Sequence, residues 1–160
     1  MEKIDLRKKL KAFYTPSAKG FSLIELPSLQ YLMIDGHGDP ALVQEYSEAV
    51  QTLYGISYTL KFHLKKTQDI DYTVMSLEGL WWMPDMREFS LERRADWDWT
   101  MMILQPDFIT PDLVEQAKAQ ATAKGKAPLA DRLRLATLEE AACVQIMYFG
   151  AYVDEAPVIA

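Results

Sequence analysis

One acidic residue, Glu78, stands within an almost uncharged run that is rich in aromatic side chains and extends over residues 74–83. A carboxylate in such a run must face water, meet a partner or take a raised pKa, because burying an unpaired charge is costly. A strand that alternates between the two faces of a sheet would leave Glu78 solvated on the outer face. The other arrangement points Glu78 into a functional site, which makes it the first functional candidate.

The composition is that of one ordinary globular domain. The chain has 160 residues, of which 49% are hydrophobic and 25% are charged, and a chain of this length buries a substantial core. The formal net charge of −6 argues against nucleic-acid binding, which needs clustered Lys and Arg. No apolar run is long enough to span a membrane, and the charged amino terminus does not resemble a signal peptide. We therefore expect a cytoplasmic protein that binds neither nucleic acid nor a membrane.

The first forty residues predict a polar lead-in followed by strand structure. Residues 1–20 form the lead-in, with a short helical piece over residues 6–13. The apolar runs at residues 22–27 and 30–35 are bounded by turn residues, which is typical of strands.

Two helices have recognisable starts. Asp39 suits a helix N-cap and Pro40 the first helical position, and apolar residues then recur at spacings of three and four as far as Leu64. Thr110 and Pro111 open a second helix in the same way, before a Lys-Gly-Lys segment that breaks it. Both helices are expected to place one apolar face on the core.

Three further segments complete the predicted fold. Residues 71–77 and 97–104 are rich in aromatic and β-branched side chains and read as two strands of an antiparallel pair. Residues 129–140 suit either a helix or a strand, and the apolar residues 142–150 suit a strand. The order of elements predicts an α+β domain with helices packed on one face of an antiparallel sheet.

Short motifs along the chain carry a family resemblance. They occur in order as Asp35-Gly36-His37-Gly38-Asp39-Pro40, Leu53-Tyr54-Gly55, Tyr58-Thr59-Leu60-Lys61-Phe62, Leu77-Glu78-Gly79-Leu80-Trp81-Trp82, Trp97-Asp98-Trp99-Thr100 and Ile103-Leu104-Gln105-Pro106-Asp107-Phe108. Across roughly residues 1–153 this ordered set closely resembles the GyrI-like small-molecule-binding family. The resemblance implies a pseudo-twofold fold of two strand-helix-strand-strand modules that share a sheet and leave an apolar cleft. It also implies binding of amphipathic or cationic small molecules, and in a subset of members hydrolysis of cyclopropane-bearing genotoxic natural products.

The chain departs from the family pattern near its end. Family members ordinarily have a His and a Pro in the last strand, where this chain has Tyr148 and Ala151. They also continue with a further helix and two strands that carry a second acidic residue, whereas this chain stops at Ala160. Glu78 would then act without its usual acidic companion.

These departures shape the expected organisation. We expect a single GyrI-like domain over residues 1–160, with residues 21–104 as the first module and residues 105–160 as the start of an incomplete second module. An exposed strand edge over residues 144–152 would invite strand pairing, so a homodimer formed through this C-terminal edge is expected as a partner arrangement.

A binding function would combine the Glu78 charge with aromatic surfaces. The expected partner is an apolar or cationic small molecule, for which each cation–π contact contributes about 0.5–2 kcal/mol, and binding would protect the cell from toxic compounds. The candidate ligand-binding residues are one acidic and several aromatic side chains: Tyr31, Glu78, Trp81, Trp82, Trp97 and Trp99. Core packing is an equally good interpretation of the tryptophans. A regular strand puts Trp82 on the Glu78 face and Trp81 on the other, whereas a bulge at Gly79 would reverse this choice.

A catalytic function would use the same carboxylate. Glu78 would act as the general base of a hydrolase that draws a proton from water, while the hydroxyl of Tyr148 or Tyr152 polarises a ligand carbonyl. An ordinary core or surface position in a strand is the preferred interpretation of both tyrosines. His37 and His63 lack acidic or thiol ligands at useful spacing, so neither a metal site nor a cofactor is expected. A third hypothesis, a protein-interaction modulator that resembles gyrase inhibitors, rests on the family name.

Overall fold

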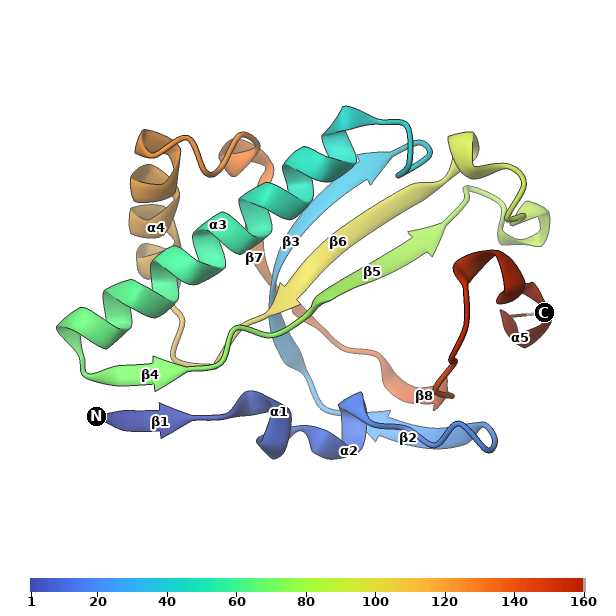
Figure 1. Cartoon of the computed structure of the whole chain (residues 1–160), viewed down its shortest axis with the longest axis horizontal. Helices are drawn as coiled ribbons and strands as arrows, with labels where there is room; N and C mark the ends of the chain where they lie inside the picture. Colours follow the sequence, from blue (N-terminus) through green and yellow to red (C-terminus); the bar gives the residue numbers. More distant parts are fainter. Residues whose placement is uncertain (160) are drawn as a thin grey trace.

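A four-stranded antiparallel sheet forms the centre of the protein (Figure 1). The computed structural model describes residues 1–159, so the last residue of the expected domain, Ala160, lies outside the described part. The strand order is β5-β6-β3-β7, formed by β3 (Leu29–His37), β5 (Leu77–Trp82), β6 (Asp98–Leu104) and β7 (Arg134–Leu138). Helix α3 (Gln44–Thr67) covers one face of this sheet, and α4 (Pro111–Ala123) packs against α3. The α+β class expected from the sequence is confirmed.

The main core lies between α3 and one face of the sheet. In the β3–β6 register, Leu32 pairs with Ile103 and Ile34 pairs with Met101, and all four side chains are buried. Helix α3 contributes fully buried residues at helical spacing: Leu53, Ile56, Leu60 and Leu64. Gly36 continues the same face of β3, where a Cβ atom would overlap the ring of Trp99. A glycine at position 36 thus lets the large Trp99 ring pack flat against the strand.

The two predicted helix starts have different outcomes. Thr110 caps α4, since its hydroxyl accepts a hydrogen bond from the Leu113 amide at 3.3 Å, and Pro111 is the first helical residue, as expected. The expected N-cap at Asp39 is wrong, because α3 begins only at Gln44. The Asp39 side chain instead accepts from the Ala41 amide at 2.9 Å, which closes a local turn.

The amino-terminal lead-in is more ordered than the sequence suggests. Strand β1 (Glu2–Ile4) pairs in parallel with β4 (Ile70–Tyr72), and two single-turn helices follow, α1 (Leu6–Lys9) and α2 (Lys11–Tyr14). The predicted strand over residues 71–77 is therefore divided. Its first part joins β1, and its last residue, Leu77, begins β5.

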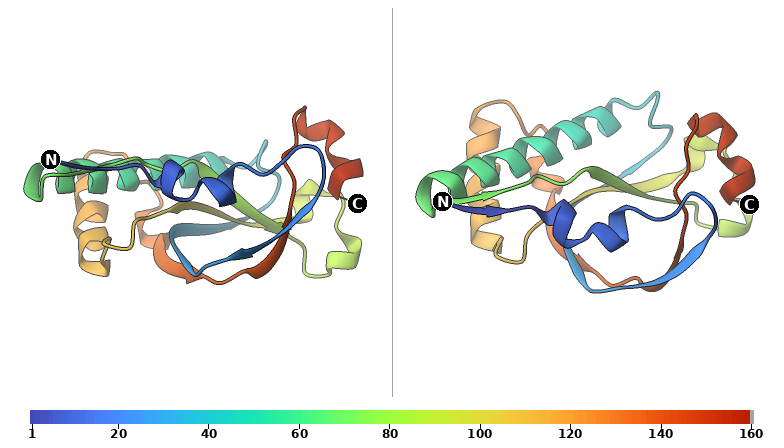
Figure 2. Two further views of the ribbon diagram at one scale, coloured as in Figure 1. Left: turned by 90° about the horizontal axis from the view of Figure 1, so that it is seen from below. Right: turned by 60° about the horizontal axis from the view of Figure 1, so that its bottom comes forward.

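A two-stranded antiparallel ribbon, β2 (Ser22–Leu26) with β8 (Ala141–Gln145), extends from the sheet. Figure 2 shows this ribbon on the side of the sheet opposite α3. The strand predicted over residues 142–150 ends at Gln145, so the free strand edge expected over residues 144–152 is short. After it come a 3-10 turn (Tyr152–Asp154) and α5 (Ala156–Ile159). None of the helices within residues 1–159 is both long enough and apolar enough to cross a membrane.

Candidate functional site

The strand β5 carries Glu78 to the face of the sheet opposite α3. Its register against β6 is continuous from Leu77 to Trp82, without a bulge at Gly79. Trp81 pairs with Trp99, whose ring meets Tyr46 of α3, so Trp81 lies on the helix face. Alternation then places Glu78 and Trp82 together on the other face.

A tyrosine from the lead-in meets Glu78. The hydroxyl of Tyr14, the last residue of α2, donates a hydrogen bond of 2.8 Å to Oε2 of Glu78. Tyr31 of β3 pairs with Leu104 of β6. Because the preceding residue, the buried Ile103, faces the helix, Leu104 and its partner Tyr31 face the other way, on the same side of the sheet as Glu78. Three segments far apart in the sequence thus converge on one carboxylate.

The environment of Glu78 raises its pKa above the ordinary value of a glutamate. Burial raises the pKa of the half-buried Glu78 carboxyl, and the negative charge of Glu140 raises it further, while the Tyr14 hydrogen bond opposes both effects. Burial and the Glu78 charge raise the pKa of Tyr31 to about 12, and they also raise the pKa of Tyr14. Both phenols therefore remain protonated donors at neutral pH beside a carboxylate with a raised pKa.

Three of the four tryptophans belong to a packed cluster on the helix face. The ring of Trp81 lies edge-on to that of Trp97, with centroids 5.6 Å apart, and 6.1 Å from Tyr46. Trp99 meets Tyr46 at 5.4 Å and is fully buried. The structure therefore does not bring Trp81, Trp97 or Trp99 to Glu78, and packing accounts for their positions. Trp82 alone among the tryptophans shares the Glu78 face.

The two predicted catalytic tyrosines of the last segment are placed differently from Tyr14. The hydroxyl of Tyr148 donates to the carbonyl of Ala151 at 3.2 Å, and Tyr152 is 83% exposed. Neither hydroxyl makes a hydrogen bond to Glu78 within residues 1–159. The hydroxyl that contacts Glu78 is instead that of Tyr14, whose place at the end of a single-turn helix in the lead-in gave no sequence signal for this contact.

In the described part of the chain, no three or more His, Cys, Asp or Glu side chains come together in a way that could bind a metal ion. His37 is exposed, and its Nδ1 lies 2.8 Å from Oδ1 of Asp98. The side chains that the structure brings together at Glu78 are one carboxylate and the phenols of Tyr14 and Tyr31. Such a set can hold a water molecule, accept its proton at Glu78 and donate hydrogen bonds from the tyrosines.

Solved structures of similar proteins define the family. The chain is 39% identical to an uncharacterized conserved protein from Listeria innocua, with a TM-score of 0.89, over 98% of this chain and 76% of that one. It is 38% identical to a hydrolase from Listeria innocua, with a TM-score of 0.87, over 99% and 77% of the two chains. A further structure of a hydrolase from this organism gives 36% identity, a TM-score of 0.83 and coverages of 98% and 76%.

The identity and coverage extend over nearly all of this chain, so it belongs to the family of these Listeria innocua proteins. No family model and no curated protein matches the sequence.

Proposed function

We propose that this protein is a hydrolase of small molecules within the GyrI-like family, with Glu78 as its general base. The observation that carries the proposal is the half-buried Glu78 carboxylate with its raised pKa, held by Tyr14 at 2.8 Å. A general base works best when its pKa lies near the operating pH. Two of the similar structures are of hydrolases, which supports the same class of reaction.

The resemblance to GyrI-like proteins suggests an activated cyclopropane as the substrate. Glu78 removes a proton from a bound water molecule while the water oxygen bonds to a ring carbon. The strained carbon–carbon bond breaks, and its electron pair moves to a conjugated carbonyl oxygen. The proton held by Glu78 then passes to the product, which restores the carboxylate, so the net change is addition of one water molecule.

Tyr31 suits the second role in this reaction. Its pKa is raised to about 12, so its hydroxyl stays protonated and donates a hydrogen bond to the oxygen that gains charge. Tyr14 holds the Glu78 carboxylate in one orientation through their hydrogen bond. We assign Tyr14 as a positioning residue and Glu78 as the catalytic one.

Binding without turnover is a second candidate, favoured by the position of Trp82. Its side chain shares the sheet face of Glu78, so a hydrophobic cation there would meet both a counter-ion and an indole ring. Binding of this kind would sequester a toxic compound without any chemical step.

One set of variants separates the two candidates. The test measures saturable quenching of tryptophan fluorescence by a hydrophobic cation, and hydrolysis of a cyclopropane-bearing electrophile, in the wild type and in Glu78→Gln. Glu25→Gln is the matched control, since Glu25 is an exposed glutamate on β2. A hydrolase loses about 10²- to 10⁴-fold in turnover in Glu78→Gln and keeps it in Glu25→Gln.

The outcomes are distinct. Turnover that survives in Glu78→Gln would remove the proposed base and contradict the hydrolase mechanism. Saturable cation binding that weakens in Glu78→Gln, with no turnover of several cyclopropanes by the wild type, would favour sequestration.

A further inference from the structure

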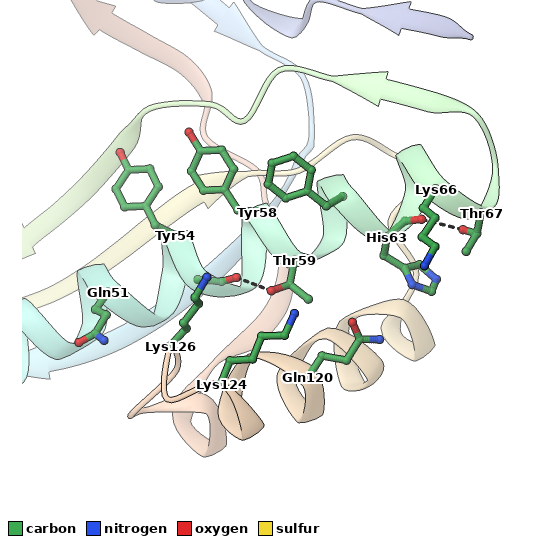
Figure 3. A pocket seen from close by; sticks show the side chains of 12 residues that line it. Gln51, Tyr54, Tyr58, Thr59, His63, Lys66, Thr67, Gln120, Lys124 and Lys126 are labelled. Carbon is green, nitrogen blue, oxygen red and sulfur yellow. Dashed lines mark hydrogen bonds between the residues drawn. The ribbon is translucent and has the colours of Figure 1, made fainter.

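A groove of about 880 Å³ lies over the outer side of α3, beside the carboxyl end of α4 (Figure 3). Its floor is the surface of α3 at the half-buried Gly55 and Thr59, where the Thr59 hydroxyl donates to the Gly55 carbonyl at 2.7 Å. A Cβ atom at Gly55 would overlap the carbonyl of Lys126. The glycine therefore lets the loop after α4 approach the helix and form one wall of the groove.

The other wall of the groove is an aromatic ledge, formed by Tyr54, Tyr58 and Phe62 at intervals of four residues along α3. Neighbouring rings are stacked, with centroids 6.4 Å and 6.2 Å apart. The Tyr54 hydroxyl accepts from the Leu77 amide at 3.2 Å, which fixes that end of the ledge. Tyr58 is 46% exposed and Phe62 is 59% exposed, so a flat apolar surface faces solvent.

The wall contributed by the loop after α4 is basic. Lys124 and Lys126 line it, and Lys66 stands at the far end of the groove (Figure 3). No acidic side chain lines the groove, and within residues 1–159 none of these three lysines has an ion-pair partner. By contrast, Lys61 and Lys65, on the same helix, both pair with Asp71. An unpaired positive patch on a chain of formal charge −6 is suited to an anion.

We propose that this groove binds a planar, apolar-bodied anion, such as an aromatic carboxylate, sulfonate or phosphate ester. The ring system would lie on the aromatic ledge and the anionic group would face Lys124 and Lys126. Ligand sites commonly have this volume and combine apolar walls with a few convergent polar groups. The groove lies over α3 and Glu78 lies on the opposite face of the sheet, so this is a second site that does not depend on the proposed hydrolase.

A fluorescent probe tests the proposal directly. The anion 8-anilinonaphthalene-1-sulfonate is titrated into the full chain, alongside N-phenyl-1-naphthylamine, which has the same rings without the sulfonate. The variants are Lys124→Gln with Lys126→Gln, and Phe62→Ala. Matched controls are Lys9→Gln with Lys19→Gln, at exposed lysines elsewhere, and Phe149→Ala, at an aromatic residue that is 79% exposed.

The wild type is expected to bind the sulfonate saturably, with one site per chain. The double lysine variant should weaken that affinity about tenfold, because each solvent-exposed charge contributes modestly, and Phe62→Ala should weaken it as well. The control variants and Glu78→Gln should bind as the wild type does. The proposal would be overturned if the wild type bound the uncharged probe as tightly as the sulfonate. It would also be overturned if the double lysine variant bound the sulfonate as tightly as the wild type does.

Discussion

Replacing Tyr14 by Phe isolates the contact that holds Glu78. The substitution removes one hydroxyl and leaves the ring, so the packing of α2 stays filled. What is lost is the 2.8 Å hydrogen bond from the Tyr14 hydroxyl to the Glu78 carboxylate. Because this bond lowers the pKa of Glu78 against the opposing effect of burial, its loss raises that pKa further.

The expected loss of stability in Tyr14→Phe follows from the charge on the acceptor of the lost hydrogen bond. A hydrogen bond to a charged group contributes about 1.5–3 kcal/mol to the free energy of unfolding. Glu78 is half-buried, so water replaces part of the lost bond, and we expect Tyr14→Phe to cost about 1–2 kcal/mol at neutral pH. The bond stabilises the ionised carboxylate. Its contribution is therefore present above the folded-state pKa of Glu78 and declines as the pH falls through it.

Urea denaturation at neutral and acidic pH measures this difference. Tyr58→Phe is the matched control, because Tyr58 is 46% exposed on α3 and Glu78 lies on the sheet face opposite that helix. The destabilisation by Tyr14→Phe should be larger at neutral pH than near about pH 4, where the carboxyl is protonated. The same loss at both pH values would refute the assignment of this bond to the ionised form.

Three further predictions concern other parts of the molecule. Gly55→Ala should destabilise the fold by about 1–3 kcal/mol in urea denaturation, because its Cβ overlaps the Lys126 carbonyl; Gly20→Ala, in open space, should not. Within residues 1–159 the buried hydroxyl of Tyr72 has no hydrogen-bond partner. Tyr72→Phe should therefore leave the free energy of unfolding unchanged or raise it by about 1–2 kcal/mol in thermal unfolding. A clear loss of stability would contradict this. For a hydrolase, the rate should fall as the pH drops through the raised pKa of Glu78; a pH–rate profile that is flat down to about pH 4 would contradict this.

Local signals in the sequence were sufficient for much of the fold. The Thr110-Pro111 start of α4 depends on side-chain capping within a few residues, and the structure has it as predicted. The alternation that groups Trp82 with Glu78 also holds, since β5 is regular along its length. In both cases neighbours along the chain determine the outcome.

The remaining features depend on contacts between distant segments. Asp39 has the chemistry of an N-cap, yet its side chain closes a turn and α3 begins five residues later. The strand predicted over residues 71–77 divides because β1 supplies a partner for its first part. Tyr14 reaches Glu78 across 64 positions, and no spacing rule in the sequence connects them.

The placement of oxygen in the reaction product tests the role of Glu78 most directly. An activated cyclopropane is incubated with the protein in ¹⁸O-labelled water, and the product is analysed by mass spectrometry. We predict that the wild type adds one labelled oxygen to the opened ring carbon and that Glu78→Gln forms this product about 10²- to 10⁴-fold more slowly while still binding the substrate. Labelled product formed at the wild-type rate by Glu78→Gln would contradict the account.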